Sequence, residues 1–472
     1  MRILQATQSP PDYIPPPTLA PDQVICGPQY PDRRDSDSVR SIATQKGAYD
    51  IAEVVARLPS GQRPELFVCR ADSSGANMPR NVASLGCRTA LIIGDTHHLR
   101  NPITSLLAYA LAEPYDVVIL DYTRQHAHFF LEAGLKRVYW LPGFNVDRVV
   151  LPPVPRPDIP MSFVGQTGEF HRRRHAVIEA LTRAGLPLKV GEADRANARL
   201  IHARTQINLN CSLNGDLNLR VFEVVASGGF LLTDRLGPES GLDLLLKEGR
   251  HYVAYDGIED CIEKSRRYLR DRVEAAAIAR AGKARYERVL APERIRADFL
   301  ALLERGIARP EFDLKRDRRI GWPKVSDRAA LMARIAVYEV LQALQLSRER
   351  SAVLASASVD PAFLIDAGDL VRVGIAVDAS SGETEVKFLA DFLSRVGMER
   401  AVRLLRRSEE IAPGPWDALV TTRAEWRRHE HVFARNPQAV LILADLGDIV
   451  PADIEAAGFQ RLSTRGPVFT RA

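Results

Sequence analysis

Residues 218–234 read Asn-Leu-Arg-Val-Phe-Glu-Val-Val-Ala-Ser-Gly-Gly-Phe-Leu-Leu-Thr-Asp, and this stretch decides the fold class. A polar start leads into an apolar run with helical spacing, and Gly228 and Gly229 then stop the helix. A buried type of strand follows at once, from Phe230 to Thr233. In parallel α/β sheets, ligands bind at strand ends and helix N-termini. The stretch therefore predicts an α/β unit with a binding site near the start of this helix.

Arg220 and Glu223 lie near the start of the predicted helix. The guanidinium fork of an arginine can bind a diphosphate, and a carboxylate can accept both hydroxyls of a ribose. The segment thus offers one partner for each half of a nucleotide diphosphate. An ordinary amphipathic helix with a glycine cap before a core strand would show the same pattern.

The segment resembles the donor-binding segment of GT-B glycosyltransferases, which consist of two facing Rossmann-like domains. It is closest to the group 1 glycosyltransferases that include the CgeB-like proteins. The matching residues are Arg220, Phe222, Glu223, Gly228, Gly229 and Asp234. The resemblance, over residues 1–310, implies a hexosyltransferase-type enzyme that uses a nucleotide-diphosphate sugar as donor. It implies a glycan, protein or small-molecule acceptor and no requirement for a cofactor or a metal.

Composition narrows the class of protein further. A chain of 472 residues can bury the cores of two or three domains. The net charge of +5 is small for this length, and no basic patch with interleaved aromatic residues indicates nucleic acid. The five cysteines are scattered without CxxC spacing, which favours a reducing cytoplasm over a disulfide framework or a zinc site. No apolar run reaches membrane-spanning length, and the N-terminus lacks a signal-peptide core.

The first two domains are predicted from alternating strands and helices. Residues 1–150 are predicted to form a Rossmann-like domain with a parallel sheet and a helix over 48–58. The resemblance implies that this domain binds the acceptor. The proline-rich segment 151–160 is the predicted linker. Residues 151–310 form the donor-binding domain, whose last helices pack back across the domain junction in the family.

Residues 311–472 predict a third α/β domain after a charged linker at 308–319. Its last strands resemble the C-terminal half of a class I methyltransferase. The expected glycine-rich loop, placed after a first strand at 372–377, has one late glycine, Gly382. This favours a role in assembly, including self-association, or in acceptor recognition over methyl transfer. A bifunctional glycosyltransferase and methyltransferase, and a non-catalytic assembly protein, remain alternatives.

Three further positions belong to the predicted donor site. Gly165 follows the first strand of the second domain, where a glycine lets the backbone approach a ligand. Arg172 adds positive charge at the next helix N-terminus. Asn218 directly precedes Leu219 and Arg220 in a loop that also suits a plain turn. Many related retaining enzymes have a glutamate where Gly215 stands here, so the stereochemical course stays open.

Asp95, His97 and His98 follow a predicted strand of the first domain and are the candidate catalytic residues. A histidine there could deprotonate an acceptor hydroxyl, because its pKa lies near working pH. Asp95 could orient that histidine or act as the base itself. The alternative is a helix N-cap with two exposed histidines.

Overall fold

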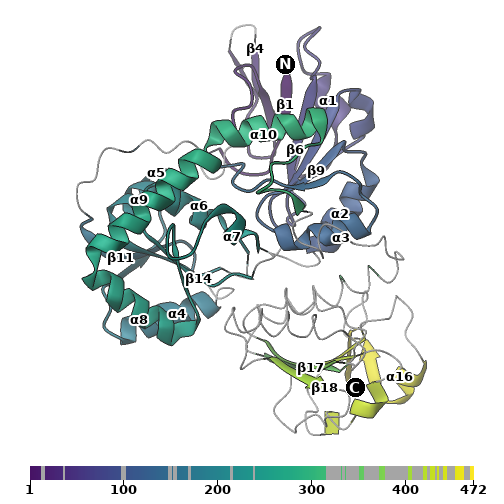
Figure 1. Cartoon of the computed structure of the whole chain (residues 1–472). Helices are drawn as coiled ribbons and strands as arrows, with labels where there is room; N and C mark the ends of the chain where they lie inside the picture. The colour runs from purple at the N-terminus through teal and green to yellow at the C-terminus, as the bar shows by residue number, and fades with distance from the viewer. Residues whose placement is uncertain are drawn as a thin grey trace.

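The computed structural model describes residues 1–314, except 12–15, 36–37, 97–101, 147–150, 152–156, 168–171, 213–215 and 238–239, together with shorter segments between 331 and 471. The described residues contain three large sheets, with helices packed on the first two (Figure 1). Two Rossmann-like α/β units and a third α/β unit follow one another along the chain, as the sequence predicts.

The first sheet has eight strands in the order β10-β9-β8-β6-β1-β2-β4-β3. Seven run parallel: β1 (Ile3–Ala6), β2 (Val24–Gly27), β4 (Ser38–Ala43), β6 (Leu66–Ala71), β8 (Arg88–Ile93), β9 (Val117–Leu120) and β10 (Val138–Trp140). The edge strand β3 (Arg33–Asp35) pairs antiparallel with β4. The central strands are buried on both faces, as continuous apolar runs in parallel sheets usually are.

The predicted helix over 48–58 is wrong in part. The chain forms β5 (Gly47–Asp50), which pairs with β7 (Asn77–Arg80) in a small parallel sheet. Only α1 (Ile51–Val55) is helical, capped by the Asp50 carboxylate that accepts from the Ala52 amide at 2.8 Å. Helices α2 (Pro102–Ala112) and α3 (Ala127–Glu132) complete the unit.

The second sheet has five parallel strands in the order β12-β11-β13-β14-β15. They are β11 (Ile159–Val164), β12 (Leu188–Gly191), β13 (Thr205–Asn210), β14 (Leu231–Asp234) and β15 (Val253–Tyr255). The helices are α4 (Arg172–Arg183), α5 (Arg195–Arg204), α6 (Leu219–Ala226), α7 (Leu242–Leu245), α8 (Gly257–Arg270) and α9 (Arg272–Val289). The predicted helix and strand of 218–234 are confirmed as α6 and β14.

Helix α10 (Pro292–Arg305) leaves the second unit and packs on the first (Figure 1). The Phe299 ring lies 4.9 Å from the Phe144 ring, centroid to centroid, and is fully buried. The Arg137 guanidinium donates to the Leu302 carbonyl at 3.0 Å. The start of the predicted charged linker is also part of this core, because Phe312 packs edge-on against Trp140.

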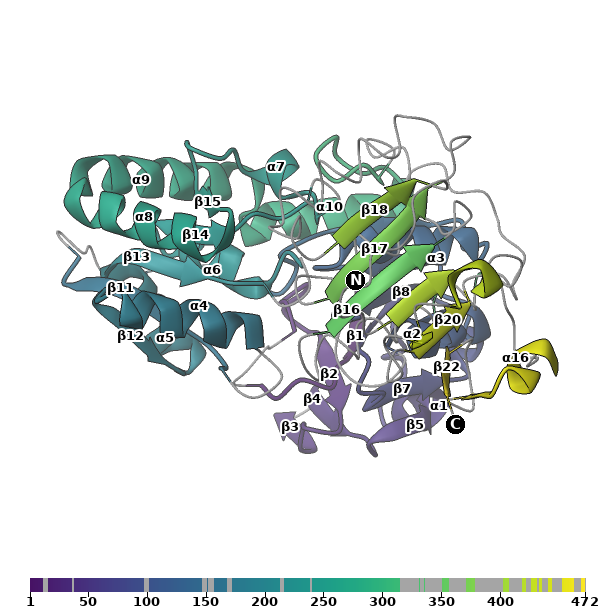
Figure 2. The ribbon, with the colours of Figure 1, turned by 90° about the horizontal axis from the view of Figure 1, so that it is seen from below.

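The third sheet has the order β18-β17-β16-β19-β20-β22-β21 (Figure 2). Its strands are β16 (Arg350–Ala355), β17 (Val371–Val377), β18 (Val402–Arg406), β19 (Ala418–Thr421), β20 (Val440–Leu443), β21 (Phe459–Arg461) and β22 (Val468–Arg471). The terminal pair β21 and β22 is antiparallel. The first strand is β16, not the stretch 372–377, so the loop after Val377 follows the second strand of this unit.

Candidate functional site

The second sheet reverses its strand order between β11 and β13. Ligands of open α/β sheets bind outside the carboxyl ends of the strands at such a switch point. The Arg220 side chain bridges these two strand ends. Its Nε donates to the Val164 carbonyl at 2.6 Å, and its Nη1 donates to Asn210 Oδ1 at 2.8 Å. Helix α6 thus carries the predicted ligand-binding arginine to the switch point.

Gly165 directly follows β11 and touches Arg220. Its φ of +143° is a conformation that residues with a side chain rarely adopt. An added Cβ would lie 2.0 Å from Arg220 Nη2. The glycine therefore lets the arginine lie across the end of β11, which is a physical reason for a glycine at this predicted position.

A second arginine flanks Arg220. The guanidinium carbons of Arg220 and Arg174 lie 4.3 and 5.4 Å from the centroid of the Phe163 ring. Arg174 also donates to the carbonyls of Gln166, at 2.7 Å, and Cys211, at 3.2 and 3.3 Å. It thereby ties together the loops that follow β11 and β13.

The carboxylates of Glu223 and Asp216 offset part of the charge of Arg220. Within the described part of the chain, no carboxylate oxygen forms an ion pair with Arg174 or Arg220. Burial, and after it the charge of Arg174, lowers the pKa of the Arg220 guanidinium to about 10. An anion bound between the strand ends would oppose both effects.

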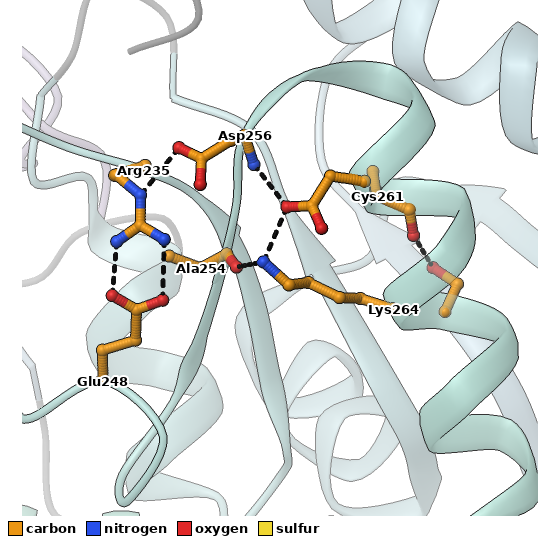
Figure 3. A network of polar contacts seen from close by, with 8 residues as sticks. Arg235, Glu248, Ala254, Asp256, Cys261 and Lys264 are labelled. Atoms are coloured by element: carbon orange, nitrogen blue, oxygen red, sulfur yellow. Dashed lines mark hydrogen bonds and ion pairs between the residues drawn. The ribbon is translucent and has the colours of Figure 1, made fainter. Parts of the chain in front are cut away.

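Arg235, at the same sheet edge, differs from Arg220 because it forms ion pairs with carboxylates (Figure 3). Its guanidinium forks onto the Glu248 carboxylate, with one nitrogen–oxygen distance of 2.8 Å, and its Nε donates to Asp256 at 2.7 Å. Nearby, Lys264 binds Asp260 at 2.6 Å. Because two carboxylates already neutralise Arg235, it is a poor candidate for binding an anionic ligand.

Glu223 lies one turn after Arg220 on α6 and close to the first unit. One carboxylate oxygen is 4.0 Å from Arg195 Nε, and the two side chains are 16% and 10% exposed. Phe222, next to it in sequence, packs on Tyr122 of the first unit with ring centroids 6.1 Å apart. The start of α6 is therefore where the carboxyl-edge loops of the two sheets meet.

Asn218 is the N-cap residue of α6 and has extended backbone angles. Its Nδ2 donates to Asn210 Oδ1 at 3.2 Å, so Asn210 accepts from both Asn218 and Arg220. The Asn218 Oδ1 atom is buried and has no hydrogen-bond partner within the described residues. This oxygen can accept a hydrogen bond from a ligand at the switch point.

Gly228 and Gly229 lie at the other end of α6 from Arg220. An added Cβ on Gly229 would lie 2.5 Å from Asn208 Nδ2 and 2.7 Å from the His202 carbonyl. Gly228 has a φ of +77° and ends the helix. Close packing and helix termination account for both glycines, which the structure does not bring to the switch point.

Arg172 begins α4, next to Arg174, and its side chain lies outside the described residues. Asp234 is fully buried and accepts from the backbone amide of Ser212 at 2.9 Å. It therefore holds the loop that follows β13 by this hydrogen bond. Arg174 and Arg195 were not among the predicted site residues; the run Arg172–Arg174 was the available signal for the first of them.

The predicted acceptor-side residues are described only in part. Asp95 follows β8, and its carbonyl accepts from the Ser73 amide at 3.3 Å. His97 and His98 lie outside the described residues. Next to Asp95, the Thr96 hydroxyl lies 2.6 Å from Nδ1 of His126, and both residues are fully buried.

Gln8 marks the switch point of the first sheet, where the strand order reverses between β1 and β6. Its Nε2 donates to Asp72 at 2.6 Å, while its buried Oε1 has no hydrogen-bond partner within the described residues. Sequence reasoning missed Gln8, because a single glutamine after a strand carries no motif.

No group of three or more His, Cys, Asp or Glu side chains in the described part of the chain could hold a metal ion. No helix within the same residues has the length and apolar character needed to cross a membrane.

Residues 159–301, from β11 into α10, match a protein-family model described as glycosyl transferase-like. A search of curated proteins gives no match. Among solved structures, HepE from Anabaena in complex with UDP and glucose is 13% identical, with 64% of this chain and 99% of that chain covered and a TM-score of 0.47. Sucrose-phosphate synthase from Thermosynechococcus elongatus is also 13% identical, with 64% and 98% covered and a TM-score of 0.44. A glycosyltransferase from Rickettsia africae is 12% identical, with 64% and 97% covered and a TM-score of 0.43.

Proposed function

We propose that the chain is a glycosyltransferase that binds a nucleotide-diphosphate sugar at the β11–β13 switch point and transfers the sugar, a hexose, to an acceptor hydroxyl. The observation that supports this best is the position of Arg220, which lies across both strand ends beside Gly165. It stands in the part of the chain that matches the glycosyl transferase-like family. Arg220 and the dipole of α6 would stabilise the departing diphosphate without a metal.

The roles of the remaining residues follow from their places around Arg220. Glu223 would accept the ribose hydroxyls, and Asn218 Oδ1 would accept one further hydrogen bond from the donor. Arg172 and Arg174 would add positive charge at the start of α4. On the first unit, Asp95, His97 or His98 would take the proton of the acceptor hydroxyl.

The first test is donor binding and turnover. The protein is incubated with a panel of nucleotide-sugars, and release of free nucleotide is measured. Calorimetry with uridine or guanosine diphosphate then compares the wild type with Arg220→Ala. Loss of a charged hydrogen bond to a ligand should weaken binding about tenfold or more.

Arg235→Gln is the matched control, because it removes an arginine from the same sheet edge whose charge is already neutralised. We expect it to keep the affinity of the wild type. Equal affinities of a folded Arg220→Ala variant and the wild type would refute the assignment of the site. No nucleotide binding and no turnover with any donor would favour the non-catalytic assembly protein.

A second test addresses the acceptor side. Alanine variants of Asp95, His97 and His98 should keep the nucleotide affinity of the wild type. Loss of a general base lowers turnover by about 10²–10⁴-fold, so one variant should show a fall of that size. Wild-type transfer rates in all three would place the base elsewhere.

A further inference from the structure

We propose that Arg195 is a positioning residue that couples the donor-side helix α6 to the first unit. This inference rests on the proposed function, since it assigns Glu223 to the donor site. Arg195 is the first residue of α5, and its side chain is buried at the domain junction. It contacts both units at once.

On the donor side, Arg195 lies beside the carboxylate of Glu223, although its Nε forms no hydrogen bond within the described residues. The 4.0 Å separation between Arg195 Nε and Glu223 Oε1 is within ion-pair distance, and both side chains are largely buried. A carboxylate that is held by an arginine loses little rotamer freedom when it binds a ribose.

On the first unit, Arg195 binds the loop that leads out of β10. Its Nη2 donates to the Asn145 carbonyl. The Asn145 side chain is 2% exposed and donates to Asp121 at 3.2 Å. Arg195 therefore binds this loop through a backbone carbonyl and not through an exposed side chain.

The chain of contacts continues to the predicted acceptor side. Asp121 is fully buried and accepts from Arg70 Nη1 at 2.9 Å. Burial raises the pKa of the Asp121 carboxyl, and the charge of Arg70 opposes that shift. An added Cβ on Gly94 would lie 2.4 Å from Arg70 Nη2, so Arg70 packs directly under the residue that precedes Asp95.

Buried charges make this connection sensitive to domain position. If the units rotate about their junction, Arg195 must release either Glu223 or the Asn145 carbonyl, and an unpaired buried charge is costly. A ligand that engages Glu223 would thus favour one arrangement of the units over another.

The first experiment uses no ligand, so it remains informative even if the proposed function is wrong. Amide hydrogen exchange is measured for residues 141–146 and 219–226 in the wild type and in Arg195→Gln. We expect exchange in both segments to become about threefold faster or more, because one shared contact holds them. Arg204→Gln is the matched control, since Arg204 is on the same helix as Arg195 and its ion pair, with Asp158 just before β11, is exposed. A change in neither segment, or an equal change in the control, would overturn the proposal.

The second experiment separates positioning from a general effect on stability. Affinity for uridine or guanosine diphosphate is measured in Arg195→Gln, Glu223→Gln and the double variant, each at a temperature where it is folded. We expect Arg195→Gln to weaken binding about threefold or more, and to have no further effect in the Glu223→Gln background. Additive losses would mean that Arg195 does not act through Glu223. Absence of nucleotide binding in the wild type would count against the proposed function, while the exchange result would still decide the coupling.

Discussion

The position of Arg220 depends on Gly165, because the glycine leaves the space that the guanidinium fills. We expect Gly165→Ala to displace Arg220 and to weaken nucleotide binding about tenfold or more. Gly185→Ala is the control for backbone strain, because Gly185 also has a positive φ, of +72°, but no atom within 4 Å of an added Cβ. Calorimetry and thermal unfolding of both variants separate the two effects. A folded Gly165→Ala protein with wild-type affinity would contradict this explanation.

His202 makes the stability of the second unit depend on pH. Burial lowers the pKa of this histidine to about 4, while its Nδ1 lies 2.9 Å from Asn208 Oδ1. Between pH 6.5 and 4, the unfolded chain binds the proton and the folded chain does not, so stability is lost as pH falls through this window. The loss is at most about 3 kcal/mol, and it is absent above pH 6.5.

Urea unfolding of the wild type and of His202→Gln, from pH 8 to pH 4, measures this effect. The variant should lose less stability than the wild type as the pH falls from 6.5 to 4, because it lacks the titrating group. Parallel pH profiles of the two proteins would show that His202 is protonated in the folded state or that it is not buried.

At the scale of elements, α10 belongs to the core of the first unit although it follows the second along the chain. Replacing a fully buried phenylalanine by alanine costs about 3–5 kcal/mol. We expect Phe299→Ala to accelerate hydrogen exchange in β9 and β10, next to the ring of Phe144. Glu304→Ala, at an exposed position of the same helix, should change stability by about 0.5 kcal/mol or less. Destabilisation confined to residues 159–290 would contradict this packing.

The sequence predicted elements well where the hydrophobic pattern and the stop signals agreed. Residues 218–234 show such agreement, and α6 and β14 were both predicted. Helix α5 was missed because the apolar residues of 195–204 are few and its helical face is mostly polar. Strand β5 was predicted as helix, since its pairing with β7 is a tertiary contact that local propensity does not encode.

Some residues of the candidate site could be inferred from the sequence, and others could not. Arg220, Glu223 and Gly165 could be inferred because each combines a charge or a glycine with a strand end or a helix start. Arg195 could not be inferred, because its two partners, Glu223 and the Asn145 carbonyl, are distant in sequence. Gly228 and Gly229 were also predicted to belong to the donor site, but a packing requirement at the other end of α6 would produce the same pattern as a binding motif.

Two apolar residues of the predicted linker before the third unit are buried in the structure. Phe312 and Leu314 are 1% and 7% exposed and belong to the first core. We therefore expect a chain that ends at Leu314 to bind nucleotide like the full-length protein. A chain that ends at Arg309 should have a lower melting temperature, because each lost apolar side chain contributes about 1.5–3 kcal/mol. Equal melting temperatures of the two truncated proteins would contradict a contribution of Phe312 and Leu314 to this core.

The third unit lacks a sequence feature that binding of a methyl donor would need. Its sheet reverses strand order between β16 and β19, and a methyl donor bound there would need a close backbone turn after β16. Residues 356–360 read Ser-Ala-Ser-Val-Asp, without a glycine. We expect no saturable micromolar binding of S-adenosylmethionine by the full-length protein in calorimetry. Such binding would instead favour the bifunctional enzyme.

The crossing of α10 has a consequence for how the protein is made. Ribosomes add about 5–20 residues per second, so roughly 8–30 seconds separate the emergence of β10 from that of α10. During this interval the nascent first unit exposes the apolar surface that Phe299 and its neighbours later cover. A polypeptide with such an exposed surface is a substrate for chaperones that bind chains during translation. Its final folding step therefore waits for the synthesis of the entire second unit.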